Sequence, residues 1–529
     1  MSINHEAKVA APARPGRRSG GREARRALRA APLAEDIRPV RAGLEGGAYQ
    51  PLSGADVECI HSAALQILEE IGLADAPESG IKAMTDAGAK LGDDGRLRFA
   101  PSMIDDMLAV AAKDITLHGQ VPRHDLNPGG RRVHYGTAGA AVHVYDVETR
   151  TNRDPTVQDL YDAARIVEVL DNIHFFQRPL TARDVEDPTD LDVNTLYASV
   201  LGTTKHIGTS FTSPERAQMG LEMLHMVAGS EDAWRARPFV SNTNCFVVPP
   251  LKFATESCKV METLIEGGLP VLLLSAGQAG ATAPAALAGA VAQATAECLA
   301  GMIYVNALKP GHPAIFGTWP FVSDLRTGAM SGGSGEQALL TAACGQMARH
   351  YNLPGGSACA MSDSKAPDMQ AGYERGLANV MAGLSGLNLV YESVGMHASL
   401  LSFCFESLII DNDMIGQCLR CVRGIEVTDE TLSVDVMRSV CTEGPGHYLG
   451  HPQTLSLMQS EYVYPVIGDR SSPKDWIEQG KPVLVDKALA EKQRILRESF
   501  PDHIPDGVDG AIRSAFDIVL PRDRMKPAV

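Results

Sequence analysis

Aromatic side chains are scarce in this sequence, and three of them stand close after predicted strands. Phe, Trp and Tyr supply only 5% of the 529 residues, in a chain with 50 glycines. Trp319, Phe321 and Tyr391 are candidates for a binding wall, because an aromatic face attracts a methylammonium head, best with a carboxylate nearby. The alternative for each ring is ordinary packing in the core.

Charged residues follow two of the predicted strands. Asp363 and Lys365 lie in the segment Asp-Ser-Lys-Ala-Pro-Asp, and Asp324 and Arg326 lie in an earlier loop. Ionised groups at the rim of a site can orient a ligand or act as an acid–base pair. A surface ion pair explains the same residues equally well.

Three further motifs give no metal prediction. Cys418 and Cys421 form a single C-x-x-C pair, which we interpret as buried structural thiols because no second pair follows at zinc-site spacing. His447 and His451 are surrounded by Gly and Pro and lack the Glu of the zinc-protease pattern, so a loop role is favoured over a substrate contact or a metal. Residues 328–335 are glycine-rich, which suits a tight turn, a ligand contact or an anion at a helix start. We therefore predict no metal bound by this chain.

Short β-rich runs at regular intervals position these residues. Ala- and Leu-rich helical stretches separate the runs, and this alternation is typical of a parallel sheet covered by helices. Eight such units predict an α/β fold, a (β/α)₈ TIM barrel. An open doubly wound sheet is the alternative, weakened because no Gly-x-Gly-x-x-Gly follows an early strand. The expected strands are residues 133–137, 173–177, 206–210, 239–243, 271–275, 314–318, 356–360 and 388–391.

Barrel enzymes carry their chemistry at the carboxyl ends of the strands. This rule converts the strand assignment into a set of candidate residues, for each of which a plain loop or cap role is the alternative. Those that end or follow the second to eighth strands include Arg178, Ser210, Asn242, Asn244, Ser275, Trp319, Phe321, Asp324, Arg326, Asp363, Lys365, Tyr391, Glu392 and His397.

Four regions are expected along the chain. Residues 1–50 form a basic arm without fixed structure, or one that docks on an acidic neighbour. Residues 51–130 form a helical N-terminal subdomain in which Ser53 caps a helix that ends at Gly72. Residues 131–425 form the barrel, and residues 426–529 form a helical extension packed on it.

Composition excludes several classes of protein. The net charge of −16 argues against nucleic acid as a partner. No run of about 18 uninterrupted apolar residues is found, so no membrane span is expected. The twin arginines of the N-terminal arm lack a following apolar region, so an export signal is not expected. Ten scattered cysteines indicate reduced thiols in a cytoplasmic protein.

Together, five segments resemble the trimethylamine methyltransferase family of corrinoid-dependent enzymes, including members without pyrrolysine such as the glycine betaine methyltransferases. The resemblance runs from about residue 53 to about residue 522. It is carried by Asp-Leu-Arg-Thr-Gly-Ala-Met-Ser-Gly-Gly (324–333), Met-Ser-Asp-Ser-Lys-Ala-Pro-Asp-Met-Gln-Ala-Gly-Tyr-Glu (361–374), Tyr-Glu-Ser-Val-Gly-Met (391–396), Asp-Asn-Asp-Met (411–414) and Gly-Pro-Gly-His-Tyr-Leu-Gly-His (444–451).

The resemblance implies a barrel that transfers a methyl group from a methylated amine to the Co(I) corrinoid (cobalamin) of a separate small protein. Only the twenty standard residues are present here, which favours a quaternary amine such as glycine betaine. A quaternary nitrogen leaves as a neutral amine, so the protein needs only to bind and position the substrate, while the cofactor supplies the chemistry.

The resemblance also suggests roles for the candidates. Trp319, Phe321 and Tyr391 would surround the ammonium, and Glu392, Asp324 or Asp363 would supply negative charge. The substrate carboxylate would be held by one of four residues, namely Arg326, Lys365, Asn242 and His397.

Two alternatives keep the same fold. One is a barrel with a different acceptor, such as a folate, and the other is a betaine-binding barrel without catalysis. In each case a homo-oligomer is expected.

Overall fold

The computed structural model describes residues 35–187 and 190–527. Contacts between residues divide the chain into two units, Met1–Pro39 with Arg438–Tyr462 and Val40–Met437 with Val463–Val529. Residues 1–34 of the expected basic arm lie outside the described residues. The smaller unit contains helix α15 (Pro452–Ser460), and the larger unit contains the barrel.

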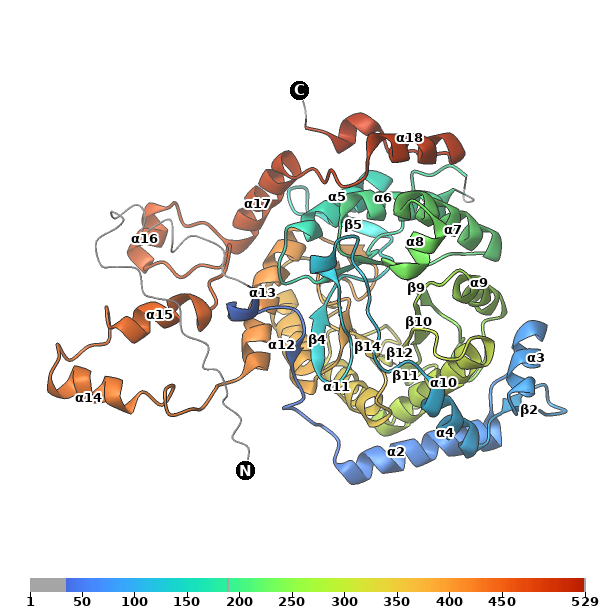
Figure 1. Cartoon of the computed structure of the whole chain (residues 1–529). Coiled ribbons are helices and arrows are strands. Elements are labelled where there is room, and N and C mark those ends of the chain that lie inside the picture. Colours follow the sequence, from blue (N-terminus) through green and yellow to red (C-terminus); the bar gives the residue numbers. More distant parts are fainter. Residues whose placement is uncertain (1–34, 188–189, 528–529) are drawn as a thin grey trace, which may run out of the picture. The chain divides into compact units, whose positions relative to one another are not determined.

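Eight parallel strands of the larger unit close into a barrel (Figure 1). Their spatial order is β4-β15-β14-β12-β10-β9-β8-β7, and a parallel bridge between Gly136 and Phe175 joins the two ends. A doubly wound sheet has two free edges, so that alternative is wrong and the predicted (β/α)₈ barrel is confirmed. The strands are β4 (Arg132–Tyr135), β7 (Phe175–Gln177), β8 (His206–Thr209), β9 (Val240–Asn244), β10 (Val271–Ser275), β12 (Ala314–Thr318), β14 (Gly355–Ala358) and β15 (Leu389–Tyr391).

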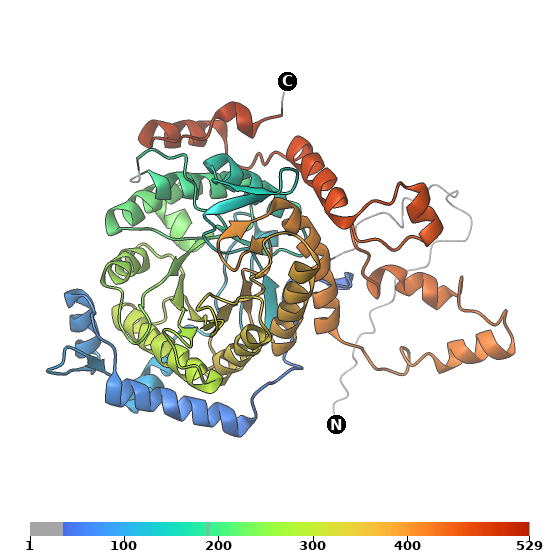
Figure 2. The same ribbon diagram turned by 180° about the vertical axis from the view of Figure 1, so that it is seen from behind.

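A ring of helices surrounds the strands (Figure 2). Several begin at a side-chain cap, as in α5, where Thr156 and Asp159 form a reciprocal capping box. The helices that follow the eight strands are α5 (Val157–Glu168), α6 (Leu191–Gly202), α7 (Pro214–Ala228), α9 (Thr255–Glu266), α10 (Leu287–Leu308), α11 (Gly335–His350), α12 (Met369–Ser385) and α13 (Phe405–Arg423).

Helix α10 is apolar on all sides because the sheet covers one side and N-terminal helices cover the other. It is long and apolar enough to cross a membrane by length and composition alone, but 89% of its apolar window is buried inside the protein. It is therefore a core helix of the barrel.

The N-terminal helices are α2 (Gly54–Gln66), α3 (Glu78–Asp86) and α4 (Pro101–Val110), which all contact α10. Ser53 is the N-cap of α2, as predicted, and forms a capping box with Asp56. The chain continues from α2 through a π-helical turn, Ile67–Ile71, to Gly72.

Short elements complete the fold. β1 (Leu44–Glu45) pairs with β4, and β2 (Lys90–Leu91) pairs with β3 (Leu97–Arg98). A second sheet contains β5 (His143–Asp146), β6 (Thr151–Arg153), β16 (Met396–His397) and β17 (Ser402–Phe403). The remaining helices are α8 (Glu231–Ala236), α14 (Val434–Thr442), α16 (Pro473–Glu478), α17 (Leu484–Glu498) and α18 (Asp506–Ala515).

Strand alternation decides which side chains face the barrel interior. Phe175 and Gln177 of β7 point inward, whereas Phe176 between them packs toward the helices. Opposite Gln177 stands Gly208, where a Cβ atom would lie only 1.5 Å from the Gln177 amide oxygen. The glycine therefore gives the Gln177 side chain its space inside the barrel.

Candidate functional site

Three aromatic rings meet inside the barrel near the carboxyl ends of the strands. The centroid of the Tyr391 ring lies 4.9 Å from that of Phe175, in an edge-to-face arrangement, and 5.3 Å from that of Trp319. Phe321 belongs to the same interior cluster. β11 (Gln278–Ala279) and β13 (Phe321–Val322) pair above β10 and β12 and hold this region in place. Thus the three predicted aromatic residues come together, joined by Phe175, which the sequence reasoning missed.

Glu392 follows Tyr391 directly and is the most unusual carboxylate of the barrel mouth. It is only 2% exposed, its Oε2 atom has no hydrogen-bond partner, and its φ of 54° lies in the left-handed region. Burial raises the pKa of Glu392 to about 8. A non-glycine residue in this backbone region is strained, and such strain is common at functional sites.

The charge of Glu392 acts on two thiols at the carboxyl ends of other strands. Burial is the largest cause that raises the pKa of Cys359, just after β14, and of Cys245, just after β9, and the Glu392 charge raises both further. These two strands are separated by β10 and β12. The Glu392 carboxyl is therefore part of the electrostatic environment of several strand ends.

Unpartnered polar atoms accompany this carboxylate. In the described part of the chain, the Trp319 indole Nε1 and the Thr243 hydroxyl are buried without a hydrogen-bond partner. Buried polar groups are normally paired, so each exception needs an explanation. A polar or charged ligand in the mouth would provide one.

Side chains on the β7–β9 side of the mouth are partly accessible to solvent. Ser210 and Thr243 are half-buried, and Cys245 is exposed. Arg178, which follows β7, donates from Nη2 to Ser210 Oγ at 2.7 Å. Solvent therefore reaches the carboxyl ends of these strands next to Arg178.

Asp363 joins two neighbouring loops of the barrel mouth. Its Oδ1 accepts from the Gly332 amide at 2.9 Å and from Ser399 Oγ at 2.7 Å, and its Oδ2 accepts from Ser331 Oγ at 3.0 Å. The glycine-rich segment 328–335, whose sequence suits a tight turn, a ligand contact or an anion site, is thereby tied to the loop that follows β15. Asp363 is placed to organise the mouth, and its oxygens are occupied by these bonds.

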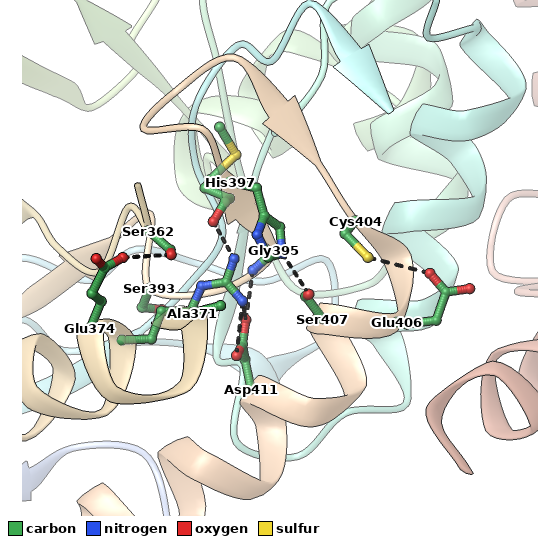
Figure 3. Close-up of polar contacts among 12 residues, drawn as sticks. Ser362, Ala371, Glu374, Ser393, Gly395, His397, Cys404, Glu406, Ser407 and Asp411 are labelled. Atoms are coloured by element: carbon green, nitrogen blue, oxygen red, sulfur yellow. Dashed lines mark hydrogen bonds and ion pairs between the residues drawn. The ribbon is translucent and has the colours of Figure 1, made fainter. Parts of the chain in front are cut away.

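Helix α12 anchors two of the mouth loops with adjacent residues (Figure 3). Glu374 Oε2 accepts from Ser362 Oγ at 2.7 Å and from the Asp363 amide at 2.9 Å. Arg375 is fully buried, pairs with Asp411 at 3.1 Å and donates to the Met396 carbonyl. These contacts fix the loops that follow β14 and β15.

Three charged candidates lie apart from the aromatic cluster. Arg326 binds Asp324 at 2.7 Å across a turn, and its side chain is 88% exposed. This hydrogen-bonded pairing lowers the pKa of Asp324 to about 2. Lys365 is exposed and donates to the Asp363 carbonyl. These contacts match the surface ion-pair and loop interpretations.

Asn242 faces the helical shell and not the barrel interior. The neighbouring Ser241 hydroxyl shares a hydrogen bond with His206 Nε2, and His206 Nδ1 contacts the His118 carbonyl. Ser241 therefore faces the barrel interior. Alternation therefore turns Asn242 outward with Asn244, which bonds the Ser257 carbonyl of α9. The Asn242 amide is buried without a partner among the described residues.

His397 is fully buried on β16 and contacts Ser407 Oγ at 2.8 Å through Nε2. Burial and the nearby Arg375 charge hold the pKa of His397 well below its usual value. The imidazole is therefore neutral, and it belongs to the anchored loop network.

The histidine and cysteine motifs fall outside this arrangement. His451 caps α15 through Nδ1, so no helix runs through both His447 and His451. Cys418 is buried and Cys421 is exposed on α13. Among the described residues, no three His, Cys, Asp or Glu side chains gather as potential metal ligands.

The fold and this mouth define a (β/α)₈ barrel with an aromatic site beside a buried carboxylate. The chain belongs to the trimethylamine methyltransferase family, which it matches over residues 18–520, and it is a methyltransferase. The residues that carried the expected resemblance lie within this range.

Several methyltransferases are similar to this chain over most of its length. The trimethylamine methyltransferase of Desulfitobacterium hafniense (strain DCB-2) is 29% identical over 479 residues, covering 90% of this chain and 95% of its own length. The glycine betaine methyltransferase of strain Y51 is 29% identical over 473 residues, covering 88% and 96%. A trimethylamine methyltransferase of Methanosarcina thermophila is 28% identical, covering 83% and 90%.

Among solved structures, the dihydropteroate synthase of Xanthomonas albilineans bound to 4-aminobenzoic acid aligns with a TM-score of 0.35 and 11% identity. It covers 59% of this chain and 100% of its own. The barrel assignment rests on the strand pairing described above.

Proposed function

We propose that this methyltransferase moves a methyl group from a quaternary or tertiary methylated amine, such as glycine betaine, to the Co(I) corrinoid of a separate partner protein. The observation that carries the proposal is the joining of Phe175, Trp319 and Tyr391 beside the buried Glu392. Aromatic faces and a desolvated carboxylate are the groups that bind a methylated cation best. We also propose a cytoplasmic homo-oligomer.

Each residue of the site has a physical task in this reaction. The rings exclude water and attract the cation, and the ionised Glu392 carboxylate compensates its charge. A corrinoid carried by a partner would supply the cobalt nucleophile. The bond between the methyl carbon and nitrogen would break as the methyl group is taken up, and nitrogen would keep the electron pair. With a quaternary donor the product amine is neutral, so no side chain must protonate it, and catalysis would consist of positioning. A tertiary donor would have to bind in its protonated, cationic form to give the same neutral leaving group.

An apolar rim supports a macromolecular acceptor. Val248 follows β9, Leu325 follows β13 and Leu401 lies between β16 and β17, and they are 55%, 70% and 58% exposed. All three stand on loops that leave the carboxyl ends of barrel strands. Large exposed apolar side chains around a site often mark an interaction surface, and this rim suits a corrinoid carried by a partner.

Methyl transfer can be tested directly. Purified protein is mixed with glycine betaine and cob(I)alamin, or with a corrinoid protein in its reduced state, and the absorbance of the methylated corrinoid is followed. We expect growth of this absorbance only when protein and betaine are both present. Betaine binding without transfer to either form of corrinoid would favour the non-catalytic barrel, and transfer to a folate would favour the other acceptor.

Loss of one aromatic face should weaken cation binding. Trp319→Leu should raise the Kd of tetramethylammonium by about 2-fold to 30-fold, because one cation–π contact contributes about 0.5–2 kcal/mol. Tyr391→Phe is the matched control, since it keeps the ring. Titration calorimetry measures both values, and an unchanged Kd for Trp319→Leu would remove this ring from the binding wall.

A further inference from the structure

Arg178 is a cation at the barrel mouth without an anionic contact partner. Its Nη2 donates to Ser210 Oγ at 2.7 Å and its Nη1 donates to Thr181 Oγ1 at 3.2 Å. Throughout residues 35–187 and 190–527, no carboxylate lies within ion-pair distance of Arg178. A guanidinium carries five N–H donors and stays charged, so two hydroxyl contacts leave part of its capacity unused.

The acidic side chain whose charge acts on Arg178 has other hydrogen-bond donors. Burial lowers the pKa of Arg178, and the charge of Asp192 on α6 opposes this shift. Oδ2 of Asp192 accepts from the Thr212 amide at 2.7 Å and from Thr212 Oγ1 at 2.8 Å. Asp192 therefore caps the loop after β8.

Arg178 and Glu392 both follow strands at the carboxyl end of the barrel, after β7 and β15. Phe175 of β7 contacts the Tyr391 ring, which directly precedes Glu392, so the strand that carries Arg178 also supplies a ring of the aromatic cluster. Burial raises the pKa of the Cys245 thiol, and the charges of Arg178 and Glu392 act on it in opposite directions. The mouth thus carries a positive group, the partly exposed Ser210 and the exposed Cys245, and an aromatic cluster beside a buried carboxylate.

We propose that Arg178 binds an anionic group of the substrate, so that this site takes a zwitterion whose carboxylate and methylated nitrogen are held by different walls. This inference rests on the proposed function and narrows its substrate class from methylated amines in general to those that also carry a carboxylate. Arg178 is then the specificity-determining residue. It replaces Arg326 and Lys365, which the structure places at the exposed surface.

Two ligands separate the proposal from a structural role of Arg178. Glycine betaine carries the anion, and tetramethylammonium lacks it. In Arg178→Gln the Kd of glycine betaine should rise by about 30-fold or more, the scale of losing one partner of a desolvated charge pair. The Kd of tetramethylammonium should stay within about 2-fold of wild type, and Arg178→Lys should recover part of the betaine affinity.

Arg237→Gln is the matched control. Arg237 pairs with Asp125 at 2.7 Å at the opposite end of the barrel, before β9 begins. Its loss should leave both affinities unchanged. If Arg178→Gln weakens both ligands equally, or if wild type binds the two equally well, Arg178 does not bind the anion and the proposal is wrong.

Alkylation of Cys245 gives a second readout that is independent of turnover. Glycine betaine should slow iodoacetamide modification of Cys245 in wild type but not in Arg178→Gln, as measured by mass spectrometry. The exposed Cys59 and Cys421 serve as internal controls. Equal protection in both proteins would contradict the proposal, whereas failure of methyl transfer with intact, Arg178-dependent betaine binding would contradict only the proposed reaction.

Discussion

Glu392→Gln should bind glycine betaine about 30-fold more weakly than wild type above about pH 8, and its affinity should no longer rise with pH. Burial raises the pKa of the Glu392 carboxyl to about 8, so the group is largely protonated at neutral pH before ligand binds. A cation that binds beside it favours the ionised form, and the proton is released. Calorimetry in buffers of different ionisation enthalpy measures that release.

The same carboxyl links stability to pH. Its pKa is about 8 in the folded protein against an ordinary value of 4.5, so the folded state binds more protons between these values. The stability that this group contributes is complete below about pH 4.5 and is lost as the pH rises through about 8. Glutamine does not titrate. Between about pH 4.5 and 8 the free energy of unfolding should therefore fall less in Glu392→Gln than in wild type, and the two decreases should differ by on the order of a few kcal/mol.

Urea unfolding at several pH values measures this difference in stability. Glu336→Gln is the matched control because the Glu336 side chain is exposed at the start of α11. Identical pH profiles for wild type and Glu392→Gln would show that this carboxyl is not held in its protonated form by burial.

Arg375→Met should destabilise the protein by about 3–5 kcal/mol, because it leaves the Asp411 carboxylate buried without its cation. The Arg375 and Asp411 side chains are only 2% and 3% exposed. Asp411 also accepts from the Gly395 amide at 2.8 Å, so the loop after β15 should lose its order as well. Chemical unfolding measures the free energy, and hydrogen exchange of the loop amides reports the local effect.

Two controls separate the buried pair from general effects of removing arginine. The double variant Arg375→Met with Asp411→Leu should recover much of the lost stability, since no charge stays buried alone. Arg494→Met breaks two surface ion pairs, with Glu491 and Glu498, and should cost less than about 1 kcal/mol. Equal losses in Arg375→Met and the double variant would contradict the explanation.

The barrel itself could be predicted from sequence because its signal is repeated. Each strand is a short β-rich run followed by a long helix, and the spacing recurs eight times, so a small error in one boundary does not change the topology. Ser53 was predictable for a similar reason, since its cap depends on Asp56 three residues later. Patterns of this kind are predictable because neighbouring residues in the sequence determine the local geometry.

The site was only partly predictable because it depends on the direction in which each side chain points. Trp319 and Tyr391 were found through scarcity of aromatic residues and position after a strand. The same rule selected Arg326 and Lys365, which leave the strand ends toward solvent, and Asn242, whose strand was correct but whose face depends on alternation phase. Phe175 carried only a weak signal, its place in a predicted strand.

The charge of a residue did not show whether its side chain is available to a ligand, because its hydrogen-bond partners were unknown. Asp363 and Arg178 both follow strands, and the sequence assigned a role only to Asp363. Within the described residues the Asp363 oxygens accept hydrogen bonds from loop donors, whereas Arg178 contacts only two hydroxyl groups through its side chain at the barrel mouth. Which ionised group is available to a ligand is settled by its tertiary hydrogen bonds, which no spacing pattern contains.

Helix α12 holds the loops after β14 and β15 through two consecutive residues, Glu374 and Arg375. Because both attachment points lie on one helix, their spacing is set by the helix itself. A displacement of α12 would therefore move the supports of both loops together.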